Sequence, residues 1–156
     1  MKNLIYTIAI FTVVINTTSC IQSKNTGSDE KAIIITLKKF YTEYIISIAT
    51  PDSIPLSKGT DAIQKKYCTP NLINRIQKQF ENEEIDADPF LKAQDTDIRF
   101  LETLSVKKDS TRLNDFIVSY ECSYISPADN KEVNNPIVIH LTVIKEKEGF
   151  KIDSVW

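Results

Sequence analysis

Residues 116–124 read FIVSYECSY, and residues 137–144 read IVIHLTVI. In the first stretch the apolar residues alternate with polar ones, which is typical of a strand with one buried face. The second stretch is apolar at almost every position, which predicts a central strand covered on both faces. Two further alternating stretches flank this pair. The sequence therefore predicts four strands, over residues 98–106, 116–124, 137–144 and 150–156, and the large side chain of Trp156 is expected to fill the core.

The residues before these strands follow the period of a helix. Apolar side chains recur every three or four positions over residues 33–48, which predicts a helix of about five turns after a cap at Ser28 or Asp29. A second helix is predicted over residues 57–67. Thr69-Pro70 then predicts the start of a third helix, because threonine caps and proline fits the first helical position.

Length and element order together define the fold class. The chain has 156 residues, which is enough for one domain of ordinary size. Helices that precede a run of turn-linked strands cannot supply the crossovers of a parallel sheet. We therefore expect a single α+β domain over residues 29–156, with three N-terminal helices packed on a curved, four-stranded antiparallel sheet. The net charge of −2 leaves no basic excess for binding nucleic acid.

The first twenty residues have the organisation of a secretory signal. Lys2 precedes an uncharged apolar run over residues 4–15, and small polar residues lead from there to Cys20. The apolar run is shorter than the ~20 residues that a membrane-spanning helix needs. Cys20 after small residues resembles a lipobox, although Thr17 stands where that pattern prefers leucine. Residues 1–19 are therefore predicted to be a lipoprotein signal peptide and Cys20 the acylated residue; the alternative is ordinary cleavage near Ser19.

The sequence after Cys20 predicts where the protein resides. Residues 20–28 are polar and are expected to form a flexible tether behind the lipid. Residues 21–25 contain no acidic side chain. Because an acidic patch directs some lipoproteins to the cell surface, we expect a bacterial outer-membrane lipoprotein that faces the periplasm.

Two short motifs resemble a known family. Residues 66–70 read KYCTP, and residues 86–95 read DADPFLKAQD. Both are similar to segments of an uncharacterised family of envelope lipoproteins in the nuclear-transport-factor-2-like superfamily. The resemblance implies a cone-like fold, in which helices close a curved sheet, and a location in the cell envelope. It implies no catalytic residues.

The second motif belongs to a stretch with four aspartates within twelve residues, 86–97. Four aspartates surround the apolar triplet Pro89-Phe90-Leu91, and calcium sites use carboxylates at such short spacings. The central glycine and distal glutamate of the helix–loop–helix calcium motif are absent. We therefore expect these aspartates to cap turns, with a ligand site as the alternative. The residues are Asp86, Asp88, Asp95 and Asp97.

Other side chains could line a pocket in the cone. Glu102 interrupts an otherwise apolar strand face, where burial would raise its pKa. His140 is the only histidine, so it cannot form a multi-histidine metal site. With Tyr120 and Tyr124, these residues are the candidates for a ligand pocket, although core and rim positions are the ordinary explanation for them. No metal and no cofactor is predicted.

Two cysteines remain besides Cys20. In an oxidising compartment Cys68 and Cys122 could form a disulfide. They could equally be unpaired thiols that pack as small apolar side chains. The sequence does not choose between these two states.

We therefore expect a membrane-tethered, non-catalytic envelope lipoprotein. It would bind a small ligand or a protein partner through the cone or through a sheet face. A homodimer could cover the outer face of residues 137–144. The alternatives are a small inhibitor or immunity lipoprotein, and an enzyme of the isomerase or dehydratase type that uses Glu102, His140 and Tyr120.

Overall fold

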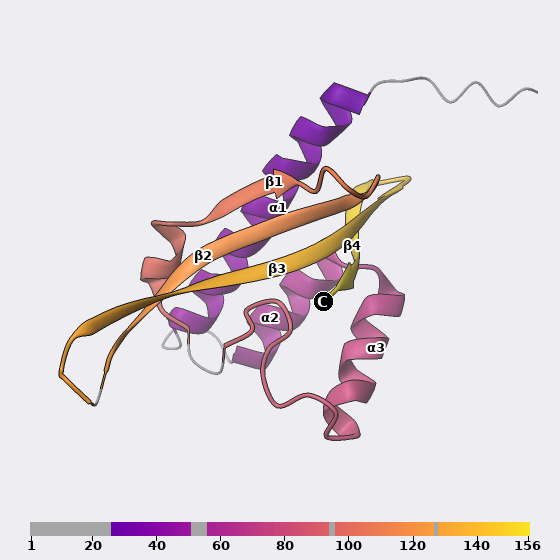
Figure 1. Ribbon diagram of the computed structural model, residues 1–156. Helices are drawn as coiled ribbons and strands as arrows, with labels where there is room; N and C mark the ends of the chain where they lie inside the picture. The colour runs from indigo at the N-terminus through magenta and orange to yellow at the C-terminus, as the bar shows by residue number, and fades with distance from the viewer. Residues whose placement is uncertain (1–25, 51–55, 94–95, 127) are drawn as a thin grey trace, which may run out of the picture.

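The computed structural model of the protein describes residues 26–50, 56–93, 96–126 and 128–156. The chain forms helices first and strands afterwards, and the strands build one antiparallel sheet in the order β1-β2-β3-β4 (Figure 1). The predicted α+β class, with three α-helices and a four-stranded antiparallel sheet, is confirmed. The elements are α1 (Thr26–Ala49), α2 (Leu56–Tyr67), α3 (Pro70–Glu81), the 3-10 helix η1 (Ile98–Leu101), β1 (Ser105–Lys108), β2 (Asp115–Ile125), β3 (Glu132–Glu146) and β4 (Gly149–Val155).

The start of α3 agrees with the cap expected from the sequence, whereas the cap expected at Ser28 or Asp29 is wrong because both residues lie inside α1. Thr69 precedes α3, and its side-chain oxygen accepts a hydrogen bond from the backbone N–H of Leu72 at 3.2 Å. Helix α1 begins at Thr26, so residues 26–28 belong to the helix and not to the predicted tether. The predicted signal peptide, Cys20 and the rest of the tether lie outside the described residues.

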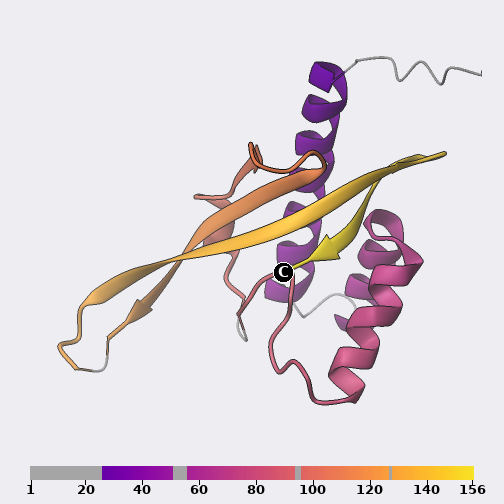
Figure 2. The same ribbon diagram turned by 45° about the vertical axis from the view of Figure 1, so that its right-hand side comes forward.

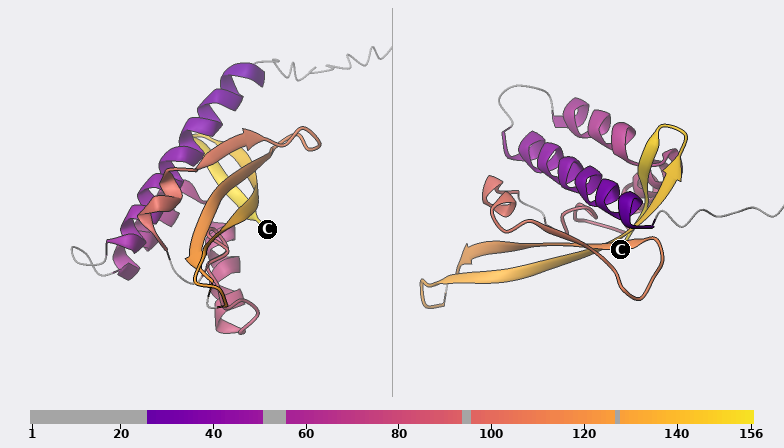
Figure 3. Two further views of the ribbon diagram at one scale, coloured as in Figure 1. Left: turned by 60° about the vertical axis from the view of Figure 1, so that its left-hand side comes forward. Right: turned by 90° about the horizontal axis from the view of Figure 1, so that it is seen from above.

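The domain has two layers, with α1 lying across one face of the sheet (Figure 3). The core between the layers is rich in aromatic side chains. Phe40 of α1 contacts the rings of Tyr41, Tyr44, Tyr67 and Phe90 at centroid distances of 5.1–5.7 Å. The sheet contributes buried side chains from all four strands, among them Val106, Phe116, Val118, Tyr120, Ile139, Leu141 and Ile152.

The prediction for the first strand was wrong over its first half. Residues 98–101 form the 3-10 helix η1, and β1 starts only at Ser105. The cause is local, because the Asp97 carboxylate accepts a hydrogen bond from the backbone N–H of Arg99 at 2.9 Å and caps the helix. Phe100 is still buried and stacks on Tyr120, with ring centroids 4.7 Å apart. The apolar spacing was therefore a correct sign of burial at Phe100 but not at Ile98, which is 49% exposed, and it was not the sign of a strand.

Strand β3 differs from the prediction in length and in covering. It begins at Glu132, five residues before the expected start, and pairs with β2 as far as Ile125. The outer ends of the two strands, residues 121–125 and 132–136, extend beyond the helices as a hairpin arm (Figures 1 and 2). Residues 139, 141 and 143 face the core, whereas Val138 on the other face is 44% exposed. Within the described part of the chain, β3 is therefore covered on one face only.

Trp156 corrects a second expectation about the core. Strand β4 places Ile152 in the core with 1% exposure, while Trp156 is 41% exposed. The Trp156 backbone exchanges two hydrogen bonds with His140 at 3.1 Å, which continues the pairing of β4 with β3 by one residue. Its side chain therefore stands on the face of the sheet that looks away from α1.

No described helix is long and apolar enough to cross a membrane.

Because of this register, Ile152→Ala should lower the free energy of unfolding by about 2–5 kcal/mol through loss of a buried side chain. Trp156→Ala should lower it by about 1 kcal/mol or less, as expected for a surface position. Urea unfolding of the two variants and the parent protein measures both values. A loss of several kcal/mol for Trp156→Ala would mean that the indole fills the core.

Candidate functional site

The structure does not gather the four predicted pocket residues into one site. Tyr120 is 2% exposed and its hydroxyl donates to the backbone oxygen of Leu91, so it belongs to the core. Tyr124, further along β2, is 51% exposed on the hairpin arm. Glu102 follows η1 and is exposed, in agreement with the rim position considered from the sequence. His140 lies on the opposite face of the sheet from Tyr120, because Tyr120 pairs with Ile137 and His140 with Ile117.

The acidic motif closes the inner face of the sheet. Phe90 and Leu91 are at most 1% exposed and insert between α1 and the sheet. Asp88 holds this loop in place: its carboxylate accepts a hydrogen bond from the Tyr44 hydroxyl at 2.6 Å and from the Phe90 backbone N–H at 2.7 Å. Burial raises the pKa of Asp88, and the two hydrogen bonds oppose this shift. The buried Tyr41 hydroxyl has no hydrogen-bond partner in the described part of the chain.

The other aspartates of the motif are spread along the surface. Asp86 is exposed, and Asp95 lies outside the described residues. Asp97 caps η1 and forms an ion pair with Arg99 at 2.7 Å, and the Arg99 hydrogen bond lowers the pKa of Asp97. The capping role expected from the sequence is thus seen at Asp88 and Asp97. Among the described residues, no group of three or more His, Cys, Asp or Glu side chains could hold a metal ion.

Cys68 and Cys122 are both free thiols. The Cys68 backbone forms an isolated β-bridge with Ile152, and Ile152 is the strand partner of Val143 in β3. Cys122 is instead the strand partner of Asn135 in β3. At about 3.3 Å per residue, Val143 and Asn135 are roughly 26 Å apart along β3, far beyond the reach of a disulfide. Burial raises the pKa of Cys68 to about 12, so this thiol stays protonated.

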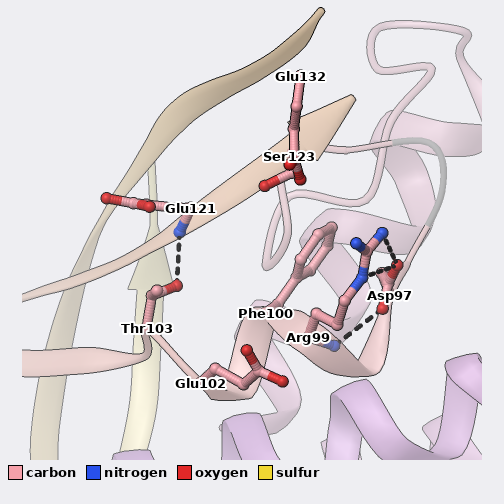
Figure 4. Close-up of a pocket in the computed structure, with 8 residues that line it drawn as sticks. All are labelled: Asp97, Arg99, Phe100, Glu102, Thr103, Glu121, Ser123 and Glu132. Carbon is pink, nitrogen blue, oxygen red and sulfur yellow. Dashed lines mark hydrogen bonds and ion pairs between the residues drawn. The ribbon is translucent and has the colours of Figure 1, made fainter. Parts of the chain in front are cut away.

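A shallow hollow of about 200 Å³ lies beside η1, where the hairpin arm leaves the domain (Figure 4). Two interactions join its lining residues: Asp97 pairs with Arg99, and the Thr103 hydroxyl accepts from the Glu121 backbone N–H at 2.9 Å. Its size is below the roughly 300–1,000 Å³ that is typical of ligand pockets. The lining residues are Asp97, Arg99, Phe100, Glu102, Thr103, Glu121, Ser123 and Glu132.

The sheet face that looks away from α1 carries a second, apolar feature, which we call the outer-face patch. It comprises Ile117 of β2, Val138 and His140 of β3, and Trp156. Ile117 and His140 are direct cross-strand partners, and the rings of His140 and Trp156 stack with centroids 6.1 Å apart. Cross-strand contacts thus make the patch continuous from β2 to the end of the chain.

Charged groups of the β1–β2 loop border the patch. The Arg112 guanidinium lies 5.6 Å from the centroid of the Trp156 ring, and it also pairs with Asp115 at 3.5 Å. The Asp109 carboxylate lies 3.9 Å from His140 Nδ1. Leu113 of the same loop is 78% exposed. The result is an apolar centre with a charged rim, which is the usual anatomy of a protein-binding surface.

The edges of the hairpin arm are protected against further strand pairing. Strand β4 leaves β3 at His140, so residues 132–138 have no second partner strand among the described residues. Pro136 offers no N–H on this stretch, and the Lys92 ammonium donates to the Val138 backbone oxygen at 3.1 Å. Proline and lysine on an edge are the means by which proteins avoid uncontrolled strand addition. We therefore place the candidate site on the outer-face patch and not along the arm.

Sequence reasoning missed most of this patch. It placed His140 and Val138 on one face, but it assigned Trp156 to the core and did not consider Arg112 or Leu113. Alternation gives the two faces of a strand but not which of them the helices cover. The sequence gives no signal for the contact between Arg112 and Trp156, because residues 44 positions apart meet only through the fold.

Comparison with known protein families gives no match, and no curated protein matches the sequence. Among solved structures, the fold is similar to a protein of unknown function from Bacteroides thetaiotaomicron. The two chains are 25% identical with a TM-score of 0.71, and the similarity covers 84% of this chain and 93% of the other. This neighbour supports the α+β architecture and names no activity.

The position of Asp88 leads to a prediction about pH. Its pKa is raised in the folded state, so the folded protein binds more protons and stability falls as the pH rises from about the ordinary value of 3.8 through the folded pKa. Asp88→Asn lacks this titration. The free energy of unfolding of the parent, minus that of the variant, should therefore decrease across this pH window and level off above it. Urea unfolding at a series of pH values tests this, and a difference that is constant or increases with pH would contradict it.

Proposed function

We propose that this protein is a lipid-anchored envelope protein that recognises a protein partner through the outer-face patch. The observation that carries the proposal is the exposed Trp156–His140 stack on a sheet face that no described helix covers. Tryptophan and arginine are the side chains that most often dominate binding energy at protein interfaces. Arg112 lies over the Trp156 ring and reduces the entropy that both side chains would lose on binding.

A protein partner agrees better with the structure than a small ligand inside a cone. Phe90, Leu91 and Tyr120 fill the space that a ligand would need between α1 and the sheet, each at most 2% exposed. The hollow beside η1 is small, and Arg99, the only cation among its lining residues, is already paired with Asp97. An enzyme that combines Glu102, His140 and Tyr120 would need them together, whereas they occupy the rim, the outer face and the core.

The anchor and the superfamily are parts of the same proposal. The signal pattern and Cys20 support acylation at the periplasmic face of the outer membrane. Helices that precede a curved antiparallel sheet, with α1 across its inner face, support a divergent nuclear-transport-factor-2-like domain in which side chains fill the cone.

The same patch offers a second candidate, a homodimer. In a dimer with a twofold axis the same patch of both copies forms the interface. Val138 of one copy would then contact the outer-face patch of the other. An inhibitor or immunity protein would instead bind one enzyme in a fixed ratio. The mass of the cross-linked product separates these outcomes.

A photo-activated cross-linking amino acid at Val138 tests the patch in cells. We expect one discrete adduct, because a defined partner covers this position, and no adduct from the exposed α3 position Gln77. Adding Trp156→Ala should reduce the Val138 adduct at least tenfold, while the exposed change Glu83→Ala should leave it unchanged. Equal labelling from Val138 and Gln77 would contradict a specific interface, and an adduct of twice the chain mass would identify the homodimer.

The anchor makes a separate prediction. Cys20→Ala removes the acylation site. The variant should therefore carry no acyl chain, and it should appear in the soluble fraction or keep its signal peptide. Fractionation and the mass of the N-terminal peptide of the parent protein measure this. A parent protein without acyl mass would overturn the anchor and leave the patch unaffected.

A further inference from the structure

Helix α1 carries an exposed stripe on the side that faces away from the core. The spacings between its members are three or four residues, so they share one face of the helix. Lys39 lies beside this line and is also exposed. Two isoleucines are exposed on this line, Ile35 at 55% and Ile46 at 39%. The α1 stripe consists of Lys31, Ile35, Lys38, Lys39, Thr42 and Ile46.

The α1 stripe is positive although the whole chain has a net charge of −2. It contains three lysines and no acidic residue. Two of the acidic side chains of α1 are engaged elsewhere: Glu43 pairs with Lys66 at 3.0 Å, and Asp29 pairs with Lys145 at 3.1 Å. Glu30 is adjacent to Lys31 in sequence but lies about 100° around the helix. The stripe therefore presents a local positive surface with two apolar side chains.

The position of α1 in the chain limits what this surface can meet. Only residues 21–25 separate Cys20 from the first residue of α1. Six residue steps reach at most roughly 20 Å, whereas the α1 stripe from Lys31 to Ile46 is itself about 22 Å long at 1.5 Å per residue. An anchored Cys20 therefore keeps the first turn of α1 within roughly 20 Å of the bilayer, and the whole stripe reaches the bilayer when α1 lies along its surface.

We propose that the α1 stripe docks on the anionic lipid headgroups of the membrane that holds the anchor. This proposal rests on the proposed function, because the lipid at Cys20 supplies the proximity. The lysines complement the negative surface, and Ile35 and Ile46 enter the boundary between headgroups and acyl chains. The contact is weak on its own, but the tether converts it into an intramolecular event with a high effective concentration.

Docking through α1 also orients the domain. The stripe lies on the side of α1 that faces away from the core, and the outer-face patch lies on the face of the sheet that looks away from α1. Figure 3 shows α1 and the sheet as the two layers between them. With α1 on the membrane, the sheet face with Trp156 and Val138 points into the periplasm, where a protein partner can reach it. The lipid contact and the proposed protein contact are therefore compatible in one orientation.

Lysine footprinting of the full chain, purified from membranes, tests the proposal. The protein is placed in vesicles of phosphatidylglycerol and phosphatidylethanolamine, or in vesicles of phosphatidylcholine alone, and treated with a water-soluble acetylating reagent. We expect the stripe lysines Lys31, Lys38 and Lys39 to react several-fold more slowly in the anionic vesicles. Reactivity should be the same in both vesicles at three exposed lysines of other surfaces, Lys78, Lys107 and Lys147.

A fluorescence reporter gives an independent measurement. The chain has one tryptophan, so Ile35→Trp in a Trp156→Phe background places the only indole on the stripe. Brominated lipids should quench this indole in anionic vesicles and should not quench the parent Trp156. Replacing the three stripe lysines by glutamine should abolish the quenching, because each lysine contributes about a fivefold factor in partitioning. The matched triple change at Lys78, Lys107 and Lys147 should leave it intact.

The outcomes for the stripe and for the anchor are distinguishable. Uniform lysine reactivity in a chain that carries the acyl mass at Cys20 would overturn the α1 docking and leave the anchor in place. Quenching of Trp156 in place of the Ile35→Trp indole would reverse the orientation and also overturn the proposal. A chain without acyl mass would overturn the anchor alone, and slower reaction of the stripe lysines with excess anionic vesicles would still support the docking.

Discussion

Thr69 is the residue at which the helical half of the chain is joined to the sheet. Its side-chain oxygen caps α3 and its hydroxyl donates to the Asp153 carboxylate at 2.8 Å. Its backbone N–H donates to the Ile152 backbone oxygen at 2.9 Å. Thr69 is 3% exposed, so these bonds are shielded from water and are strengthened accordingly. One residue thus fixes the start of α3 and the position of β4, and through β4 it fixes Trp156 beside His140.

The inner and outer faces of the sheet therefore differ: the inner face packs against the rest of the chain, and the outer face is exposed. On the inner face, the loop held by Asp88 inserts Phe90 and Leu91 among the aromatic rings of α1. The desolvated carboxylate reduces stability at neutral pH, and the Tyr44 hydroxyl offsets part of this cost by donating to it. The inner face is therefore filled by the chain itself, and recognition is left to the outside of the sheet.

The sequence predicts the features of this protein that depend on short-range physics. Thr69-Pro70 marked the start of α3, and alternation marked β2 and β4, because capping and pleating act over a few residues. The failures came from longer-range or competing effects. Asp97 caps a 3-10 turn where the apolar spacing suggested a strand, and pairing with β2 extends β3 through Pro136 and two asparagines despite their low strand propensity.

The candidate site was harder to predict for a related reason. Two features of the fold separate the three candidate residues. Tyr120 and His140 lie on opposite faces of the sheet, and Glu102 lies at the end of η1. Residue types alone predict neither the face nor the 3-10 turn. Trp156 was assigned to the core because large aromatic side chains usually are buried. The side chain of Trp156, the residue after β4, points to one face of the sheet or the other according to the strand register. The irregular register near Thr142 turns it to the outer face.

The two surfaces proposed as contacts belong to opposite layers of the domain, and they differ in chemistry. The α1 stripe combines lysines with isolated isoleucines, while the outer-face patch combines an indole, an imidazole and a valine inside a charged rim. Lysine is depleted at protein interfaces and is favoured at anionic lipid, whereas tryptophan and arginine are favoured at protein interfaces. A domain held close to a bilayer by its first helix has one side for lipid and one side for a partner, and the residues are distributed accordingly. Pro136 and Lys92 oppose the pairing of a further strand with the β3 edge of the hairpin arm. The proposed contact with a second protein therefore uses the face of the sheet and not this edge.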